Sequence, residues 1–191
     1  MVILRTTEGG RGGVRLLMSA SAEMPYFIKP SVSLSAAEKE RAYREAHAAI
    51  VATIGEERDE TLCMATINCL LKTYLPYYYW VGFYLVRGER ELIVGPYQGT
   101  LGCLTIAFGR GVCGAVAESG VTKVVQDTHA LEDGKEHIAC DPNSRSEIVV
   151  PVRRTDGSLL GVFDVDSTET GSFDETDRRW LERIVGDIFG R

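Results

Sequence analysis

The segment YWVGFYLV, Tyr79–Val86, decides the fold class, because the chain changes there from a helical pattern to a strand pattern. Its aromatic and β-branched residues are typical of a strand. The following stretch RGER predicts a turn into a hairpin partner at Glu91–Gly95. Further short strands are predicted at 104–108, 122–126, 147–152 and 159–165. A Thr-Asp-Gly-Ser turn joins the last two strands.

Helices are predicted before, between and after these strands along the chain, at 36–54, 59–74, 112–119 and 175–189. Ser35 and Glu38 form a capping-box pattern that starts the first helix. Asp174 is placed to cap the last helix, which carries an apolar stripe. Helices flanking short strands that return by tight turns predict an α+β fold, in which helices pack on a central, mainly antiparallel sheet.

Two of the predicted helices have faces that suggest how they pack. The first has a small-residue face, suited to another helix or to a partner subunit, formed by Ala42, Ala46, Ala49, Ile50 and Thr53. The second has a face at helical spacing formed by Leu62, Cys63, Ala65, Thr66, Cys69 and Leu70. We therefore expect Cys63 and Cys69 to be core residues rather than reactive thiols.

The length of 191 residues and a hydrophobic fraction of 45% suffice for one globular domain with its own core. We expect this single domain at 31–191, preceded by a disordered leader at 1–30. The leader is also weakly similar in composition to an organellar transit peptide. The net charge of −6 argues against nucleic-acid binding, and no apolar run approaches the roughly 20 residues that span a bilayer.

The five cysteines are an odd number and cannot all be paired within the chain, which favours reduced thiols in a cytoplasm-like compartment. Cys103, Cys113 and Cys140 differ from the other two, because glycines, short polar residues or turn formers flank them. Such positions allow a thiol to be exposed and ionised, which predicts redox or metal chemistry. Two alternatives stay open: incidental loop thiols, or a zinc site made of Cys103, Cys113, His137 and Cys140.

A group of acidic and aromatic residues suggests a binding pocket. Asp164 and Asp166 alternate by two, so they share one face of their predicted strand, while Val165 points the other way. Two acids on one face repel each other, which favours a bound cation or a raised pKa on one of them. Trp80 and Tyr84 also share a strand face. A solvated strand face and ordinary core aromatics are the alternatives.

Several strings in the second half of the chain resemble one known family. They are WVGFY at 80–84, GPYQG at 95–99, GRGVCG at 109–114, HIACD at 137–141 and SEIVVPV at 146–152. The order of elements and the string GVFDVDS are similar to those of a GAF domain, and the five strings resemble the free methionine-(R)-sulfoxide reductases. This resemblance covers about 31–189 and implies a GAF-like catalytic domain.

The resemblance also implies roles for individual residues. It assigns the nucleophile to Cys140, the main resolving thiol to Cys103 and an auxiliary resolving or relay thiol to Cys113. It implies that Glu147, Asp164 and Asp166 bind the amino group of the substrate and help to supply a proton. Trp80 and Tyr84 are expected around the S-methyl group. Backbone amides at 111–114 are a further candidate, for the substrate carboxylate or an oxyanion.

The activity implied by the resemblance is reduction of free L-methionine-(R)-sulfoxide to methionine, with thioredoxin as an external, NADPH-linked reductant. No bound cofactor and no metal are implied, and a cytoplasmic homodimer is expected. The loop 130–136, ALEDGKE, is longer and more charged than the family pattern, which affects the expected position of Cys140. The competing hypotheses are a GAF small-ligand sensor without turnover and a structural zinc protein.

Overall fold

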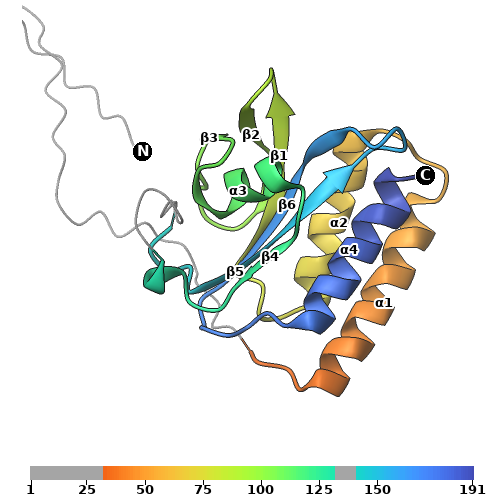
Figure 1. Cartoon of the computed structure of the whole chain (residues 1–191). Helices are drawn as coiled ribbons and strands as arrows, with labels where there is room; N and C mark the ends of the chain where they lie inside the picture. Colours follow the sequence, from red (N-terminus) through yellow and green to blue (C-terminus); the bar gives the residue numbers. More distant parts are fainter. Residues whose placement is uncertain (1–31, 132–140) are drawn as a thin grey trace, which may run out of the picture.

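The protein forms a single antiparallel sheet of six strands (Figure 1), in a computed structural model that describes residues 32–131 and 141–191. The strands lie in the order β3-β2-β1-β6-β5-β4, and every neighbouring pair is antiparallel. Their bounds are β1 (Trp80–Arg87), β2 (Glu91–Gln98), β3 (Thr105–Ala107), β4 (Lys123–Val125), β5 (Ser146–Arg153) and β6 (Leu159–Ser167). The predicted α+β class is confirmed.

The helices are divided unequally between the two faces of the sheet. The three long helices α1 (Ala36–Ile54), α2 (Glu60–Tyr74) and α4 (Glu175–Phe189) lie on one side. The short helix α3 (Gly111–Ser119) lies on the other side (Figure 1). A short 3-10 helix, η1 (Thr128–Ala130), follows β4. The face beneath α3 is therefore less fully covered than the helical face.

Alternation along the strands divides the apolar side chains between two cores. Val81 and Phe83 belong to the large core under the long helices, whereas Trp80 and Tyr84 belong to a smaller core under α3. Val165 lies in the large core, as predicted from its position between two acids. Successive strand residues point to opposite sides of the sheet, so each face of the sheet contributes side chains to a different core.

Buried charge joins the first and last helices. Lys39 of α1 is buried, and its Nζ lies 2.6 Å from Oδ2 of the fully buried Asp177 and 2.9 Å from Oδ2 of Asp174. The hydroxyl of Tyr43 donates to Oδ1 of Asp177 at 2.8 Å. Asp174 and Asp177 also form the capping box of α4. One network therefore fixes the start of α4 against α1.

The buried face of α2 differs from the predicted one. Cys63 is buried as expected, but Cys69 is exposed, so the prediction of a core role for Cys69 was wrong. Leu62 is 46% exposed. The helix instead buries Cys63, Met64, Ile67, Asn68 and Leu71. Apolar residues occur on most sides of this helix, so its sequence period did not identify the face that meets the sheet. In α1, Ala46 and Ile50 are buried as predicted, whereas Thr53 is exposed.

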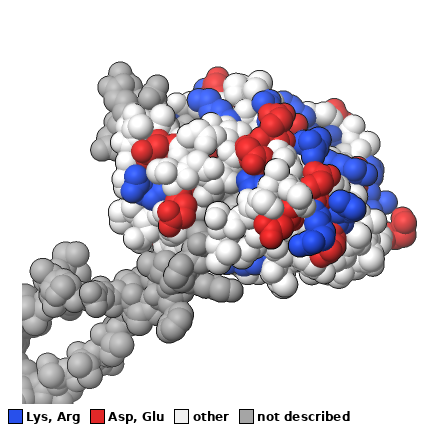
Figure 2. Space-filling view, turned by 90° about the horizontal axis from the view of Figure 1, so that it is seen from below, with Lys and Arg blue, Asp and Glu red and all other residues white. Residues whose placement is uncertain are grey.

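The outer surface carries charges of both signs. Figure 2 shows Lys and Arg side chains interspersed with Asp and Glu side chains on one face of the molecule, rather than a continuous basic area. One exposed ion pair, between a guanidinium nitrogen of Arg179 and Oε2 of Glu40 at 2.6 Å, links α4 to α1. Along the described residues, no helix has both the length and the apolar character needed to cross a membrane.

Candidate active site

A cavity lies on the face of the sheet that carries α3, with an empty volume of about 550 Å³ including its opening to solvent. We call it the α3 pocket. Its aromatic lining is Tyr79, Trp80 and Tyr84, its acidic lining is Asp141, Glu147, Asp164 and Asp166, and the start of α3 contributes Arg110, Gly111, Val112 and Cys113. The pocket therefore combines an apolar wall, several carboxyl groups and a thiol.

Strand register brings the acids together from neighbouring strands. Glu147 of β5 is the register partner of Asp166 of β6, and Asp166 is in turn the partner of Trp80 on β1. Asp164 lies two residues from Asp166 on the same face of β6, as predicted. The three carboxyl groups and the indole of Trp80 thus occupy adjacent positions of one sheet face, because side chains in register stand next to each other.

The aromatic wall is built around Trp80. Its ring stacks on Tyr84 with centroids 5.7 Å apart and planes inclined by 21°, and its Nε1 donates to the backbone oxygen of Thr100 at 3.0 Å. A Cβ atom at Gly82 would lie 2.6 Å from the Trp80 ring, and one at Gly99 would lie 2.7 Å from it. These two glycines leave the space in which the indole lies flat against the sheet.

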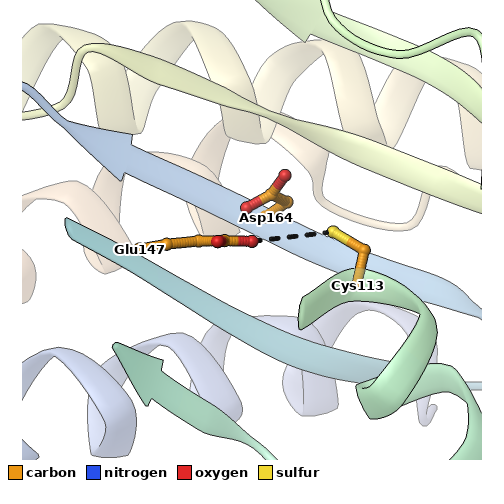
Figure 3. A group of neighbouring side chains, drawn as sticks. All are labelled: Cys113, Glu147 and Asp164. Carbon is orange, nitrogen blue, oxygen red and sulfur yellow. Dashed lines mark hydrogen bonds between the residues drawn. The ribbon is translucent and has the colours of Figure 1, made fainter. Parts of the chain in front are cut away.

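Cys113, Glu147 and Asp164 form a buried cluster at the base of the pocket (Figure 3). Sγ of Cys113 donates to Oε1 of Glu147 at 3.9 Å. One ligand atom from each of the three side chains lies within 4.8 Å of the others. Oδ1 of Asp164 is buried and accepts no hydrogen bond from any described residue. A buried acceptor without a donor is costly, so this one oxygen is a candidate to accept from a ligand in the pocket.

Burial and mutual repulsion raise the pKa values of these groups. Burial, and then the charges of Asp164 and Asp166, raise the pKa of Glu147 well above its ordinary value. Burial and the charge of Asp166 do the same to the pKa of Asp164. Burial raises the pKa of Asp166 to about 7, although the Ser144 hydroxyl, which donates to Asp166, opposes this shift. The pocket therefore holds protons on carboxyl groups near neutral pH.

Burial raises the pKa of Cys113 as well, and the neighbouring Asp164 and Glu147 carboxyl groups add to the effect. Cys113 is consequently a thiol rather than a thiolate at neutral pH. A thiol attacks poorly, because the thiolate is the nucleophile. This environment fits an auxiliary role for Cys113 better than a role in the first attack.

The start of α3 has no side-chain cap, since the N-cap residue Arg110 makes no such hydrogen bond. As far as the described residues go, the first-turn amides are thus candidates to bind an anion, as helix N-termini generally are. Gly111 has a φ of 61°, and a Cβ at Gly114 would lie 2.3 Å from the backbone oxygen of Ala107. Gly111 is thus required by its backbone angle and Gly114 by the close approach of Ala107. The amide of Gly114 is already used, because it donates to the backbone oxygen of Arg110.

The predicted cysteines lie in different settings. Cys113 lines the pocket. Cys103 is disulfide-bonded and packs against the smaller core, directly after Leu101 and Gly102, which line the pocket. Cys140, the predicted nucleophile, lies outside the described residues, and so does His137. The alternative zinc set of Cys103, Cys113, His137 and Cys140 is thus half outside the described chain.

Asp141 was not predicted as a site residue. Its Oδ2 accepts from the Tyr79 hydroxyl at 2.8 Å and also from the Thr100 hydroxyl, while its Oδ1 accepts from the amide of Asn143 at 2.8 Å. These hydrogen bonds lower the pKa of Asp141 against the opposing effect of burial. The sequence Asp-Pro-Asn carried the signal, because aspartate at such a position forms an Asx-turn. These hydrogen bonds hold Asp141, which lines the pocket, against Tyr79 and Thr100.

Comparison with known proteins gives a consistent result. The GAF-domain family profile matches residues 78–188. The chain is 37% identical over 162 residues to protein ZMO0507 of Zymomonas mobilis, covering 84% of this chain and 97% of that protein. It is 39% identical over 132 residues to free methionine-R-sulfoxide reductase of Escherichia coli, covering 68% of this chain and 77% of that enzyme.

A solved structure extends this likeness to three dimensions. The free methionine-R-sulfoxide reductase from Neisseria meningitidis, solved in complex with its substrate, is 41% identical to the chain. It superimposes with a TM-score of 0.74 over 85% of this chain and 93% of that one. On its fold, its profile match and these relatives, the chain belongs to the free methionine-R-sulfoxide reductase family of GAF domains.

Proposed function

We propose that this protein is an oxidoreductase that reduces free L-methionine-(R)-sulfoxide to L-methionine through a thiolate, sulfenic acid and disulfide cycle. The relatives named above support the reaction and the substrate. The observation that carries the proposal is the α3 pocket, in which the carboxyl groups of Glu147, Asp164 and Asp166 lie beside an aromatic wall. A zwitterionic amino acid with an apolar S-methyl end matches this combination.

The acids would hold the substrate ammonium. Within the described residues, no Lys or Arg forms an ion pair with Glu147, Asp164 or Asp166. The bound ammonium would be the opposite charge that favours the ionised form of these acids. A charge-assisted contact in a buried pocket is stronger than one in water. A peptide-linked methionine sulfoxide has no free ammonium, which accounts for a preference for the free amino acid.

The remaining parts of the substrate have matching partners. Trp80 and Tyr84 would enclose the S-methyl group against their stacked rings. The uncapped first turn of α3 would receive the substrate carboxylate. A carboxyl group whose pKa is raised to about 7, as for Asp166, is suited to donate a proton to the sulfoxide oxygen at neutral pH.

The cysteines would divide the redox steps. The Cys140 thiolate attacks the sulfoxide sulfur, the oxygen is transferred to the cysteine, and methionine leaves with a sulfenic acid remaining on Cys140. The Cys103 thiol then condenses with this sulfenic acid, which forms a Cys103–Cys140 disulfide and releases water. The disulfide-bonded state of Cys103 and the free thiols of Cys63, Cys69 and Cys113 support this pairing.

The cycle needs an external dithiol to return to its starting state. Thioredoxin, itself reduced at the expense of NADPH, would exchange with the Cys103–Cys140 disulfide and restore both thiols. We further propose that 31–191 is one catalytic domain, that it acts in the cytoplasm as a homodimer during oxidative stress, and that no bound cofactor takes part.

The test is NADPH oxidation in the presence of thioredoxin and thioredoxin reductase. We expect turnover with free methionine-(R)-sulfoxide, and little or none with the N-acetylated compound or with the S epimer. The N-acetyl group removes the ammonium charge and leaves the sulfoxide unchanged, so this comparison isolates the proposed contact. Equal rates with the free and acetylated compounds would exclude the role given to the acids.

A further inference from the structure

We propose that Cys113, Glu147 and Asp164 form a binding site for a thiophilic divalent cation such as Zn²⁺, and that this ion excludes the substrate from the α3 pocket. The binding site stands on geometry alone. Its inhibitory effect rests on the proposed function, because the ion and the substrate ammonium would use the same carboxyl groups.

The donor atoms are spaced for one ion. Zinc binds thiolate sulfur at about 2.3 Å and carboxylate oxygen at about 2.0–2.2 Å, so a tetrahedral S–Zn–O angle places the two donors about 3.5 Å apart. Sγ of Cys113 and Oε1 of Glu147 are 3.9 Å apart. All three donors lie within 4.8 Å of one another. Small side-chain rotations therefore suffice to close the three around a common centre.

The buried oxygen of Asp164 is a second and independent sign of a missing ligand. Oδ1 of Asp164 accepts no hydrogen bond from the described part of the chain, although the residue is only 6% exposed. Figure 3 shows this carboxyl group beside the hydrogen-bonded Cys113 and Glu147 side chains. Buried polar atoms are normally partnered, so an unpartnered oxygen next to two further donors indicates a site for a cation.

The kind of donor selects the kind of ion. A thiolate with two carboxylates suits zinc and similar thiophilic ions, whereas Mg²⁺ and Ca²⁺ prefer sets made only of oxygen ligands. Three protein ligands leave a fourth position, and all three residues line the pocket, so that position faces the cavity. Binding involves no redox change: the Cys113 thiol, which donates to Glu147 in the free protein, loses its proton to solvent, as does each of the two carboxyl groups that holds one, and the deprotonated side chains become ligands.

The direct test measures Zn²⁺ binding to the full chain by competition with a chromophoric chelator. We use a Cys103→Ser/Cys140→Ser background, which removes the alternative thiols. We expect one Zn²⁺ per chain, with affinity reduced about tenfold or more by Cys113→Ser or Asp164→Asn, since even groups that only orient a ligand contribute about 10–100-fold. Cys69→Ser, a change of the same kind at an exposed thiol, should leave the affinity within about twofold.

Cobalt provides a readout that a folding defect does not imitate. Co²⁺ bound in this background should give near-ultraviolet sulfur-to-metal absorption. The Glu147→Gln and Asp164→Asn variants should need a higher Co²⁺ concentration to develop this absorption. The Cys113→Ser variant should not develop it, although its circular dichroism should match that of the parent. Absence of Zn²⁺ binding in the Cys103→Ser/Cys140→Ser background, or binding unchanged by Cys113→Ser and Asp164→Asn, would overturn the proposal.

The activity measurement separates the two proposals. In wild-type protein, Zn²⁺ should raise the apparent KM for methionine-(R)-sulfoxide without lowering kcat. An absence of reductase activity would remove the proposed function and leave the binding test intact. Reductase activity together with inhibition that substrate does not relieve would refute exclusion of the substrate, whatever the outcome of the binding measurement.

Discussion

Trp80 and Asp166 are register partners on β1 and β6, so the aromatic wall and one acid of the α3 pocket stand side by side on the sheet. Asp166 is paired on its other side with Glu147 of β5. The distance between the proposed S-methyl contact and the proposed ammonium contacts is therefore fixed by backbone hydrogen bonds. If these contacts bind the substrate as proposed, the sheet rather than a flexible loop would set the distance between its two ends.

Removing one acid should weaken catalysis. Glu147→Gln, Asp164→Asn and Asp166→Asn keep the side-chain size, and each should cost about 1.5–3 kcal/mol of charge-assisted binding, or about ten- to hundredfold in kcat/KM. An acid that also donates the proton should lower kcat in addition. Steady-state kinetics with free methionine-(R)-sulfoxide measures both effects. Wild-type kinetics in all three variants would remove the proposed ammonium site.

Replacing the proposed nucleophile should abolish turnover. Cys140→Ser leaves a hydroxyl that is hardly ionised at neutral pH and forms no disulfide. Cys63→Ser and Cys69→Ser serve as matched controls and should retain near-wild-type rates. Cys63→Ser should lower the free energy of unfolding more than Cys69→Ser, because only Cys63 is buried. Turnover by Cys140→Ser at the wild-type rate would contradict the assignment.

Replacing the proposed resolving thiol should separate the first turnover from the cycle. In Cys103→Ser, rapid quenching should detect about one equivalent of methionine per chain, followed by strongly impaired thioredoxin-linked cycling. Non-reducing peptide mapping of oxidised wild type should recover a Cys103–Cys140 linkage, with a Cys113–Cys140 linkage as a minor product. Recovery of only a Cys63–Cys69 linkage would be incompatible with the cycle.

The acids should make stability depend on pH. Folding raises the pKa of Asp166 from 3.8 to about 7, so the folded chain holds this proton more tightly than the unfolded chain does. The stabilisation is complete below the unfolded pKa and is lost as the pH rises through the folded pKa. Asp166→Asn does not titrate, so its Tm relative to wild type should be higher at pH 8 than at pH 5.

A change of 1 kcal/mol in the free energy of unfolding corresponds to a shift of about 2–4 °C in Tm for a chain of this size. The raised pKa values of Glu147 and Asp164 act in the same direction, so wild type itself should lose stability between pH 5 and pH 8 through these groups. A Tm difference for Asp166→Asn that is equal at both pH values would count against the raised pKa.

The buried ion pair between α1 and α4 should be important for stability. Lys39→Met leaves the Asp177 carboxylate buried without its cation, which should cost about 3–5 kcal/mol in the free energy of unfolding. Arg179→Met removes an exposed pair between the same two helices and should cost about 0–1 kcal/mol. Urea unfolding of both variants provides the comparison. If both variants lost a similar free energy of unfolding, burial of Asp177 would not explain the stability that the Lys39 ion pair contributes.

Much of the fold could be predicted from local pattern. The bounds of α1 and α4 agree with the sequence, because Ser35 with Glu38 and Asp174 define where these helices begin. The strands were predicted to within a few residues, since turn formers separate them. The buried face of α2 was not predicted correctly, because its apolar residues are not confined to one stripe and only the packing against α1 and the sheet selects Met64, Ile67 and Leu71.

The site was predictable only in part. The period of two correctly placed Asp164 with Asp166, and Trp80 with Tyr84, in a common pocket. The contact between Cys113 and Glu147 depends on α3 crossing the sheet, and the neighbouring positions of Trp80 and Asp166 depend on β1 pairing with β6. Both contacts join residues far apart in the sequence, so a local sequence pattern could not predict them. The roles of Cys103, Cys113 and Cys140 stay predictions.

The division of the sheet into two faces has a consequence for how this protein can change over time. The large core lies between the sheet and the long helices, and the smaller core and the α3 pocket lie on the opposite face of the sheet. A substitution among the long helices alters how long the molecule survives heat or urea without touching what it binds. A substitution beneath α3 would change the pocket that we propose binds the substrate and leave the main core intact. Selection can therefore act on durability and on chemical preference almost independently.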